Sequence, residues 1–376
     1  MILFRRALTA SVVIATVSSL AVSGAALATP TSQGGPDGVL FMSEASDGTI
    51  YVGDFLNPPT AKSEFWHSAG SMVDEVAVTA TRIGWSSFMG SAELTGKVLI
   101  SDLGTTAGTV TSVDVPGSGT ISALAASVQD ETFYAVRNDN IYVIPSDGSG
   151  ATLALNDSSL STVEWGLWVD GYNQHVYWCS SGNIHSADMN NDGTLSNSTE
   201  IFTGTNPDCD GIGIDPVDGR LYMASYNSSP RFSSANADGT GSVTEITATD
   251  VPAGGAPSSM FVNHDSGTIY LATENNVYEM GFDGSNVRSL YTGTHGGAGF
   301  ENLAVAYGAT LDNIDNGGNS GGGSSGGGSG NGGGSNNNKS SELAATGSNS
   351  VDGLLIAGLL VAGGLALAAR GRRSAR

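Results

Sequence analysis

Residues 166–194 read GLWVDGYNQHVYWCSSGNIHSADMNNDGT, and this stretch decides the fold because short apolar runs alternate with polar turns. One apolar run ends at Asp170, a second carries Tyr177 at its centre, and a third leads to Asp192 and Gly193. Alternation over short runs predicts half-buried strands, and Asp-Gly is typical of a tight turn between antiparallel strands. The stretch therefore predicts one small antiparallel sheet.

The same pattern recurs along the chain. It is seen in GIGIDPVDGRLYMASYNSSPRFSSANADGT (211–240), in SSMFVNHDSGTIYLATENNVYEMGFDGSN (258–286) and, shortened, in GVLFMSEASDGTIYVGDF (38–55). One marker residue stands in each unit, namely Tyr51, Leu99, Tyr134, Tyr177, Tyr222 and Tyr270. A period near 45 residues with about four strands per unit is typical of propeller blades, which must stack because one blade cannot bury both faces.

The repeats thus predict an all-β fold, a six-bladed β-propeller over residues 37–311. The segment ENLAVAYG (301–308) resembles the first strand of a further unit. In closed propellers such a C-terminal strand completes the first blade, yet the first unit already begins with a strand. A seven-bladed ring therefore stays an alternative.

The units resemble the Tyr-Trp-Thr-Asp repeats of six-bladed propellers. The segment HVYWCSS (175–181) is the most similar, with Cys179 in the place of the threonine. The resemblance covers roughly residues 37–310 and is strongest for the last three repeats.

The N-terminal segment has the features of a secretory signal peptide. Arg5 and Arg6 precede an apolar core, and the small residues Ala26 and Ala28 stand before Thr29 as a cleavage site. We predict a signal peptide over residues 1–28 and a short extension over 29–36, with an uncleaved anchor as the alternative.

The C-terminal part changes composition twice. Residues 312–342 are rich in Gly, Ser and Asn, which predicts a disordered flexible linker or stalk. An uncharged apolar run at 353–369 is just long enough for a transmembrane helix, and the arginine-rich residues 370–376 predict a cytoplasmic tail. A simple membrane anchor is one interpretation.

Between linker and apolar run stand Leu343, Ala344, Ala345, Thr346 and Gly347. Motif, apolar run and basic tip in this order resemble the sorting signal of wall-anchored surface proteins of Gram-positive bacteria. The motif resembles the L-A-x-T-G variant that is typical of high-GC species. The resemblance implies that a sortase cleaves the Thr346–Gly347 bond and links Thr346 covalently to peptidoglycan. The protein would then be secreted, held briefly in the membrane, and finally anchored to the wall on the extracellular face.

The charge excludes one class of partner. The chain has a net charge of −22, and residues 29–346, with 8 basic and 35 acidic residues, have −27. Such a surface repels phosphate backbones, so we expect no nucleic-acid partner. It favours cations and keeps an exposed protein soluble.

Two sets of residues are candidate metal ligands. Asp188, Asn190 and Asp192 match the first half of a calcium loop, although its twelfth position is Thr199 rather than glutamate. An elongated hairpin is the alternative. Glu164, Asp210 and Glu301 precede or begin first strands and are expected at the mouth of the channel. There they would hold a divalent cation, as in propeller lactonases, or form only a solvated acidic rim.

The two cysteines, Cys179 and Cys209, are the only ones in the chain. Cys179 ends a second strand and Cys209 precedes the first strand of the next blade, so both fall on one face between adjacent blades. An exported chain can keep a disulfide, and we predict one here. It would close a loop of about thirty residues and stabilise the fold by about 3 kcal/mol.

Residues 37–311 contain neither a G-x-S-x-G nor an H-E-x-x-H motif. We therefore expect a binding or adhesion module for an extracellular protein or glycan. A metal-dependent hydrolase or lactonase in the channel and a structural wall protein without a specific ligand are the alternatives.

Overall fold

The computed structural model describes residues 38–44, 48–54, 63–67, 72–87, 94–104, 106–163, 166–204, 209–225, 231–248, 251, 257–264, 266–273, 276–292 and 300–307. The predicted signal peptide, N-terminal extension, linker, sorting motif, transmembrane segment and basic tail lie outside these residues. Within them, no helix has the length and apolarity that crossing a bilayer requires.

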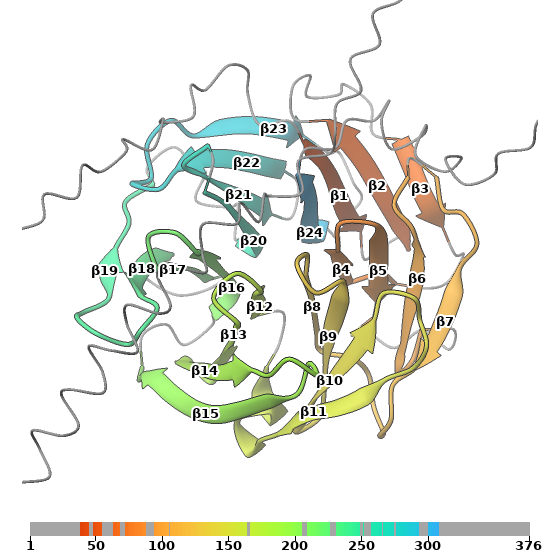
Figure 1. Ribbon diagram of the computed structural model, residues 1–376. Helices are drawn as coiled ribbons and strands as arrows, with labels where there is room; N and C mark the ends of the chain where they lie inside the picture. The colour runs from red at the N-terminus through yellow and green to blue at the C-terminus, as the bar shows by residue number, and fades with distance from the viewer. Residues whose placement is uncertain are drawn as a thin grey trace, which may run out of the picture. The chain divides into compact units, whose positions relative to one another are not determined.

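The described strands form six antiparallel sheets of four strands each, arranged as blades around one axis (Figure 1). Blade 1 contains β24 (Phe300–Tyr307), β1 (Gly38–Glu44), β2 (Thr49–Asp54) and β3 (Ser63–His67). Blade 2 contains β4 (Glu75–Val78), β5 (Arg82–Ser86), β6 (Lys97–Asp102) and β7 (Thr111–Asp114). Blade 3 contains β8 (Ala123–Ser127), β9 (Thr132–Arg137), β10 (Asn140–Pro145) and β11 (Thr152–Asn156).

The 3-10 helix η1 (Ser158–Thr162) leads from blade 3 to blade 4. Blade 4 contains β12 (Leu167–Asp170), β13 (His175–Ser180), β14 (Asn183–Met189) and β15 (Leu195–Phe202). Blade 5 contains β16 (Cys209–Asp215), β17 (Arg220–Ser225), β18 (Phe232–Asn236) and β19 (Thr244–Glu245). Blade 6 contains β20 (Pro257–Asn263), β21 (Thr268–Thr273), β22 (Asn276–Gly281) and β23 (Arg288–Thr292).

The predicted six-bladed ring is confirmed, and the seven-bladed alternative is wrong. The innermost strands contact each other in the cyclic order β24, β4, β8, β12, β16, β20 and back to β24. The C-terminal strand β24 pairs with β1 from Gly38 opposite Tyr307 to Glu44 opposite Phe300. It therefore completes blade 1 as its innermost strand, and β1 is the second strand of that blade rather than the first.

Two of the repeat markers lie on a different strand of their blade than the other four. Tyr134, Tyr177, Tyr222 and Tyr270 lie on second strands, as the repeat pattern predicts. Tyr51 on β2 and Leu99 on β6 instead lie on third strands. Counting markers still yields six, because each blade contributes one of them.

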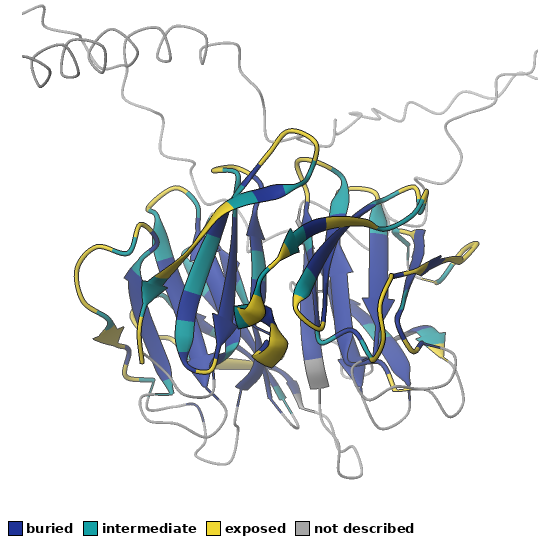
Figure 2. Ribbon diagram, turned by 90° about the horizontal axis from the view of Figure 1, so that it is seen from below, coloured by how far each residue is buried: buried dark blue, intermediate teal, exposed yellow. Residues whose placement is uncertain are grey.

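The hydrophobic core lies between the blades rather than inside any one of them. Six clusters of buried apolar side chains each join two neighbouring blades. In blade 1 every residue of β1 is buried, because one face of the sheet packs on blade 2 and the other on blade 6. Figure 2 shows the buried strands and the exposed loops that join them.

Asp-Gly turns join the third and fourth strands of blades 3 to 6. In each turn the Asp Oδ1 accepts a hydrogen bond from the backbone amide two residues later, at 2.8–3.0 Å; the aspartates are Asp147, Asp192, Asp238 and Asp283. Hydrogen bonds from the following Ser or Thr lower the pKa of all four carboxyl groups. The ionised carboxyl groups therefore stabilise the fold at neutral pH, and this stabilisation is lost as the pH falls through their lowered pKa values.

Packing between blades also requires glycine in these turns. Gly284 has a φ of +81°, and a Cβ built on it would lie 2.5 Å from the carbonyl oxygen of Thr247 in blade 5. At Gly148 the corresponding Cβ would lie 2.6 Å from Thr111 Cγ2 in blade 2. The turns thus pack closely against the preceding blade, and a side chain at the glycine would push the two blades apart.

The closure of the ring is reinforced by a chain of buried polar contacts. Ser259 on β20 donates to Asn302 Oδ1 on β24 at 3.3 Å, and Asn302 Nδ2 donates to Glu75 Oε2 on β4 at 2.9 Å. The amide of Leu124 on β8 donates to the same Glu75 oxygen at 3.3 Å. Asn302 is 7% exposed and Glu75 is fully buried. We call this chain the closure network; it links four consecutive inner strands.

We expect Gly284→Ala to destabilise the fold by about 2–4 kcal/mol, which combines left-handed backbone strain with overpacking against blade 5. The control is Gly267→Ala in the same blade, where φ is +66° but nothing lies within 4 Å of the added Cβ. That change should cost only about 1 kcal/mol. Chemical denaturation measures both, and equal losses would contradict a role for the turn in packing the blades.

We expect Asn302→Ala to lower the free energy of unfolding by about 2–4 kcal/mol, because it removes a donor to a buried carboxylate. The matched control is Asn156→Ala, since the Asn156 side chain also takes part in two hydrogen bonds but is exposed. The control should change the free energy of unfolding by about 0.5–1 kcal/mol. Similar effects of the two changes would refute the importance of the closure network.

Candidate functional site

The channel-mouth residues are only partly described. Asp210 lies half-buried on β16. Glu164 lies outside the described residues, and for Glu301 on β24 only the backbone is described. The convergence of these three carboxylates, and a hydrolase built on them, stay predictions. Among the described residues, no three His, Cys, Asp or Glu side chains are placed to hold a metal ion together.

The candidate calcium ligands each have a partner within the protein. Asp188 Oδ1 lies 3.2 Å from Nδ1 of His175. Asn190 Nδ2 donates to Thr194 Oγ1 at 3.0 Å, and Asp192 Oδ1 accepts from the amide of Thr194 at the same distance. These contacts hold the hairpin between β14 and β15 by themselves. Calcium or another divalent cation at this turn stays a prediction.

The two cysteines lie beside each other at the interface of blades 4 and 5. Cys179 on β13 and Cys209 on β16 are both buried free thiols, and burial, a hydrogen bond with Cys179 and its charge raise the pKa of Cys209. A Cβ built on Gly166 would lie 3.0 Å from Cys179 Cβ and 2.8 Å from the carbonyl oxygen of Cys209. Gly166 is thus required for the close approach of the two strands.

The tryptophans in the described residues pack into the core. Trp178 is fully buried, and its Nε1 donates to Ser159 Oγ at 3.1 Å. Trp66 and Trp168 pack against core clusters, and Trp165 lies outside the described residues. This arrangement agrees with a structural role for the tryptophans between blades.

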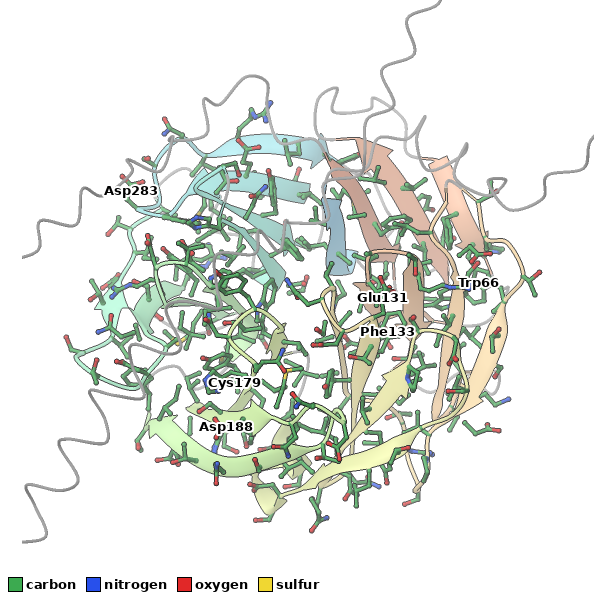
Figure 3. The ribbon with its side chains drawn as sticks, viewed as in Figure 1. Trp66, Glu131, Phe133, Cys179, Asp188 and Asp283 are labelled. Atoms are coloured by element: carbon green, nitrogen blue, oxygen red, sulfur yellow. The ribbon has the colours of Figure 1, made fainter. Side chains whose placement is uncertain are left out.

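A cleft of about 850 Å³ opens between blades 4 and 5. It lies on the face of the ring that carries the turns between first and second strands. Blade 4 and blade 5 both line it, blade 4 with Asn173, His175, Tyr177, Ser186, Thr199 and Ile201, and blade 5 with Ile214, residues 216–219 and residues 236–238. Asp188, next to this wall, is seen on blade 4 in Figure 3. We call this feature the blade 4/5 cleft.

The interfaces on the two sides of blade 5 differ at one position beside the cleft. Between blades 5 and 6, Phe282 stacks on Tyr222 with ring centroids 4.9 Å apart. The residue equivalent to Phe282 is Ala237, which likewise precedes the Asp of an Asp-Gly turn and faces Tyr177 across the cleft. Without a ring at this place, the cleft reaches the side chain of Tyr177, although that residue is only 4% exposed.

A bridge closes the inner end of the cleft. Asn173 Nδ2 donates to Asp170 Oδ2 in its own blade and to the carbonyl oxygen of Pro216 in blade 5, both at 2.8 Å. The two blades are thus held together near the axis. The space opens between them further out, and it is continuous with solvent.

The electrostatics of the cleft are acidic. Asp218 and Asp238 are exposed on the blade 5 side. Burial, and then the charges of Asp170, Asp188 and Asp238, raise the pKa of Tyr177, so its phenol is neutral at physiological pH. A neutral phenol in an acidic cleft can accept a hydrogen bond from a cation and donate one to an oxygen.

Sequence reasoning missed this site. His175, which no sequence motif singles out, lines the cleft at the start of β13. The signal was present in the repeats, because Ala237 and Phe282 occupy the same place before Asp-Gly. This signal can be interpreted only when the side chain that faces the position from the neighbouring blade is known. Only the tertiary structure shows which side chain that is.

We predict that Cys179 and Cys209 form a disulfide when the protein is exported, since the structure places the thiols side by side. Under denaturing conditions, thiol titration of the secreted protein should find about two more free thiols per chain after reduction than before. A Cys209→Ser variant should show one free thiol in both states. Equal counts with and without reductant in the unsubstituted protein would refute the disulfide.

Comparison with known proteins supports the fold. No family model matches the sequence, and no curated protein matches it either. A chain in the crystal structure of a nidogen/laminin complex is similar with a TM-score of 0.57 and 16% identity, over 72% of this chain and 98% of that one. A putative TolB from Agrobacterium tumefaciens is similar with a TM-score of 0.50 and 15% identity, over 74% of this chain and all of the other. These likenesses identify the fold as a six-bladed β-propeller of the kind that the repeats predict.

Proposed function

We propose that this protein is a wall-anchored surface protein whose propeller binds an extracellular protein or glycan at the blade 4/5 cleft. The observation that carries the proposal is the cleft itself, an open space of about 850 Å³ whose lining includes polar groups and Tyr177. Concave sites with a few convergent polar groups are where proteins bind ligands. The similar fold within a nidogen/laminin complex is in keeping with a binding role.

Display on the wall follows from the two terminal signals. The signal peptide would export the chain, and sortase cleavage after Thr346 would join it to peptidoglycan. The linker of about thirty residues would then give the propeller a root-mean-square reach of about 30 Å, and about 100 Å when extended. Such a stalk allows the cleft to meet ligands beyond the wall surface.

The anchoring step is tested with Thr346→Ala, for which we expect most of the protein to move from the muramidase-released wall fraction to the membrane fraction. Ser350→Ala, which lies beyond the predicted cleavage site, is the matched control and should leave the wall fraction unchanged. An unchanged wall fraction in Thr346→Ala would overturn sortase anchoring.

The binding step is tested by surface plasmon resonance of the purified full chain against immobilised laminin, hyaluronan and chitin oligosaccharides. We expect saturable binding to at least one of these probes. Ala237→Phe should weaken it at least about tenfold, because the new ring would fill the cleft as Phe282 covers Tyr222. Absence of binding to all three, or equal binding by the variant, would count against the proposal.

A further inference from the structure

One tyrosine side chain contributes its hydroxyl group to the blade 4/5 cleft. The Tyr177 side chain lines the cleft although its residue is only 4% exposed. Among the described residues no hydrogen-bond partner is found for its hydroxyl group. In blade 3 the equivalent Tyr134 donates to the carbonyl oxygen of Gly193. The Tyr177 oxygen is therefore available for a hydrogen bond with a ligand in the cleft.

The charges around this hydroxyl group favour a cation. Asp218 and Asp238 lie on the blade 5 side, and Asp188 lies beside His175 on the blade 4 side. Arg220 is the basic side chain near the blade 5 wall. Its guanidinium group donates to Asn236 and Ser234 within its own blade. The cleft therefore presents carboxylates to a ligand.

Exposed apolar side chains continue from the cleft along the same face. Val217, on the lip of the cleft, is 61% exposed, and Tyr172, in the equivalent turn of blade 4, is 69% exposed. Val128 is exposed in the same turn of blade 3. Three consecutive blades thus carry an exposed apolar residue between their first and second strands. A polymer that occupies the cleft can extend to these side chains, whereas a small molecule cannot.

We propose that the cleft binds a lysine or arginine side chain of a basic extracellular polypeptide, while Val217 and Tyr172 contact the residues that flank it. The proposal rests on the binding role above and specifies its partner. The Tyr177 oxygen accepts a hydrogen bond from the cationic group, and Asp218 and Asp238 supply charge complementarity. A neutral glycan has no cation for these groups, and a small amine would leave the apolar row unused.

Calorimetric titration of the full chain with hexa-arginine, in about 150 mM salt to screen long-range attraction, tests this inference. We expect one saturable site for hexa-arginine and no binding of hexaglutamate. Glucosamine, an amine without a polypeptide, should bind at least about tenfold more weakly because it cannot reach the apolar row. Equal affinity for glucosamine would overturn the assignment to a polypeptide.

Three variants locate the site. Ala237→Phe should weaken hexa-arginine binding at least about tenfold by filling the cleft, and Tyr177→Phe by about tenfold through loss of the hydrogen bond. Ala237→Ser, the matched control, should change the affinity less than about twofold. Thermal unfolding of each variant shows whether the propeller is intact. Unchanged affinity in a folded Ala237→Phe protein would show that the acidic surface binds as a whole and would overturn the inference.

The two proposals fail in different ways. If laminin or a glycan binds and hexa-arginine does not, the basic partner is wrong and the binding role stands. If hexa-arginine binding is saturable and is lost in Ala237→Phe, the partner class is supported, whatever the result with the three probes above.

Discussion

The pairing of β24 with β1 is the constraint on which the rest of the structure depends. It joins the C-terminal strand of the propeller to the N-terminal one, and it places β24 against β4 on one side and β20 on the other. Because every core cluster lies between two blades, no blade has a core of its own. Without β24, the interfaces of blade 1 with blade 2 and with blade 6 would both lose their inner strand. Closure and core formation are therefore one event.

The closure network gives this event a specific register. Ser259, Asn302 and Glu75 come from three inner strands, and their hydrogen bonds form only when the ring is closed with β24 in place. Left without partners, the same buried groups would destabilise the folded state. An open ring, or β24 shifted by one residue, would therefore expose or orphan them. The polar groups near the axis thus specify the closed form more than they add to its stability.

The cleft shows how a repeated architecture acquires a local site. The Asp-Gly turns and the tyrosines of the second strands recur from blade to blade, and their packing leaves little room for a ligand. At the interface of blades 4 and 5 a small side chain, Ala237, precedes the Asp-Gly turn, whereas Phe282 fills the equivalent place at the next interface. Since propellers support many activities, it is this difference between two interfaces, and not the fold, that points to function.

The sequence by itself determined the strands, their period, the Asp-Gly turns and a propeller of six or seven blades, because alternation and turn chemistry act between near neighbours. Only the tertiary structure decided that β1 is a second strand and that Tyr51 and Leu99 lie on third strands. That assignment depends on contacts such as Ser43 with Asn302, 259 positions apart, about which local patterns carry no information. The cleft was likewise decided in three dimensions. Whether Ala237 leaves a space or merely completes a core depends on the side chain that faces it from the neighbouring blade.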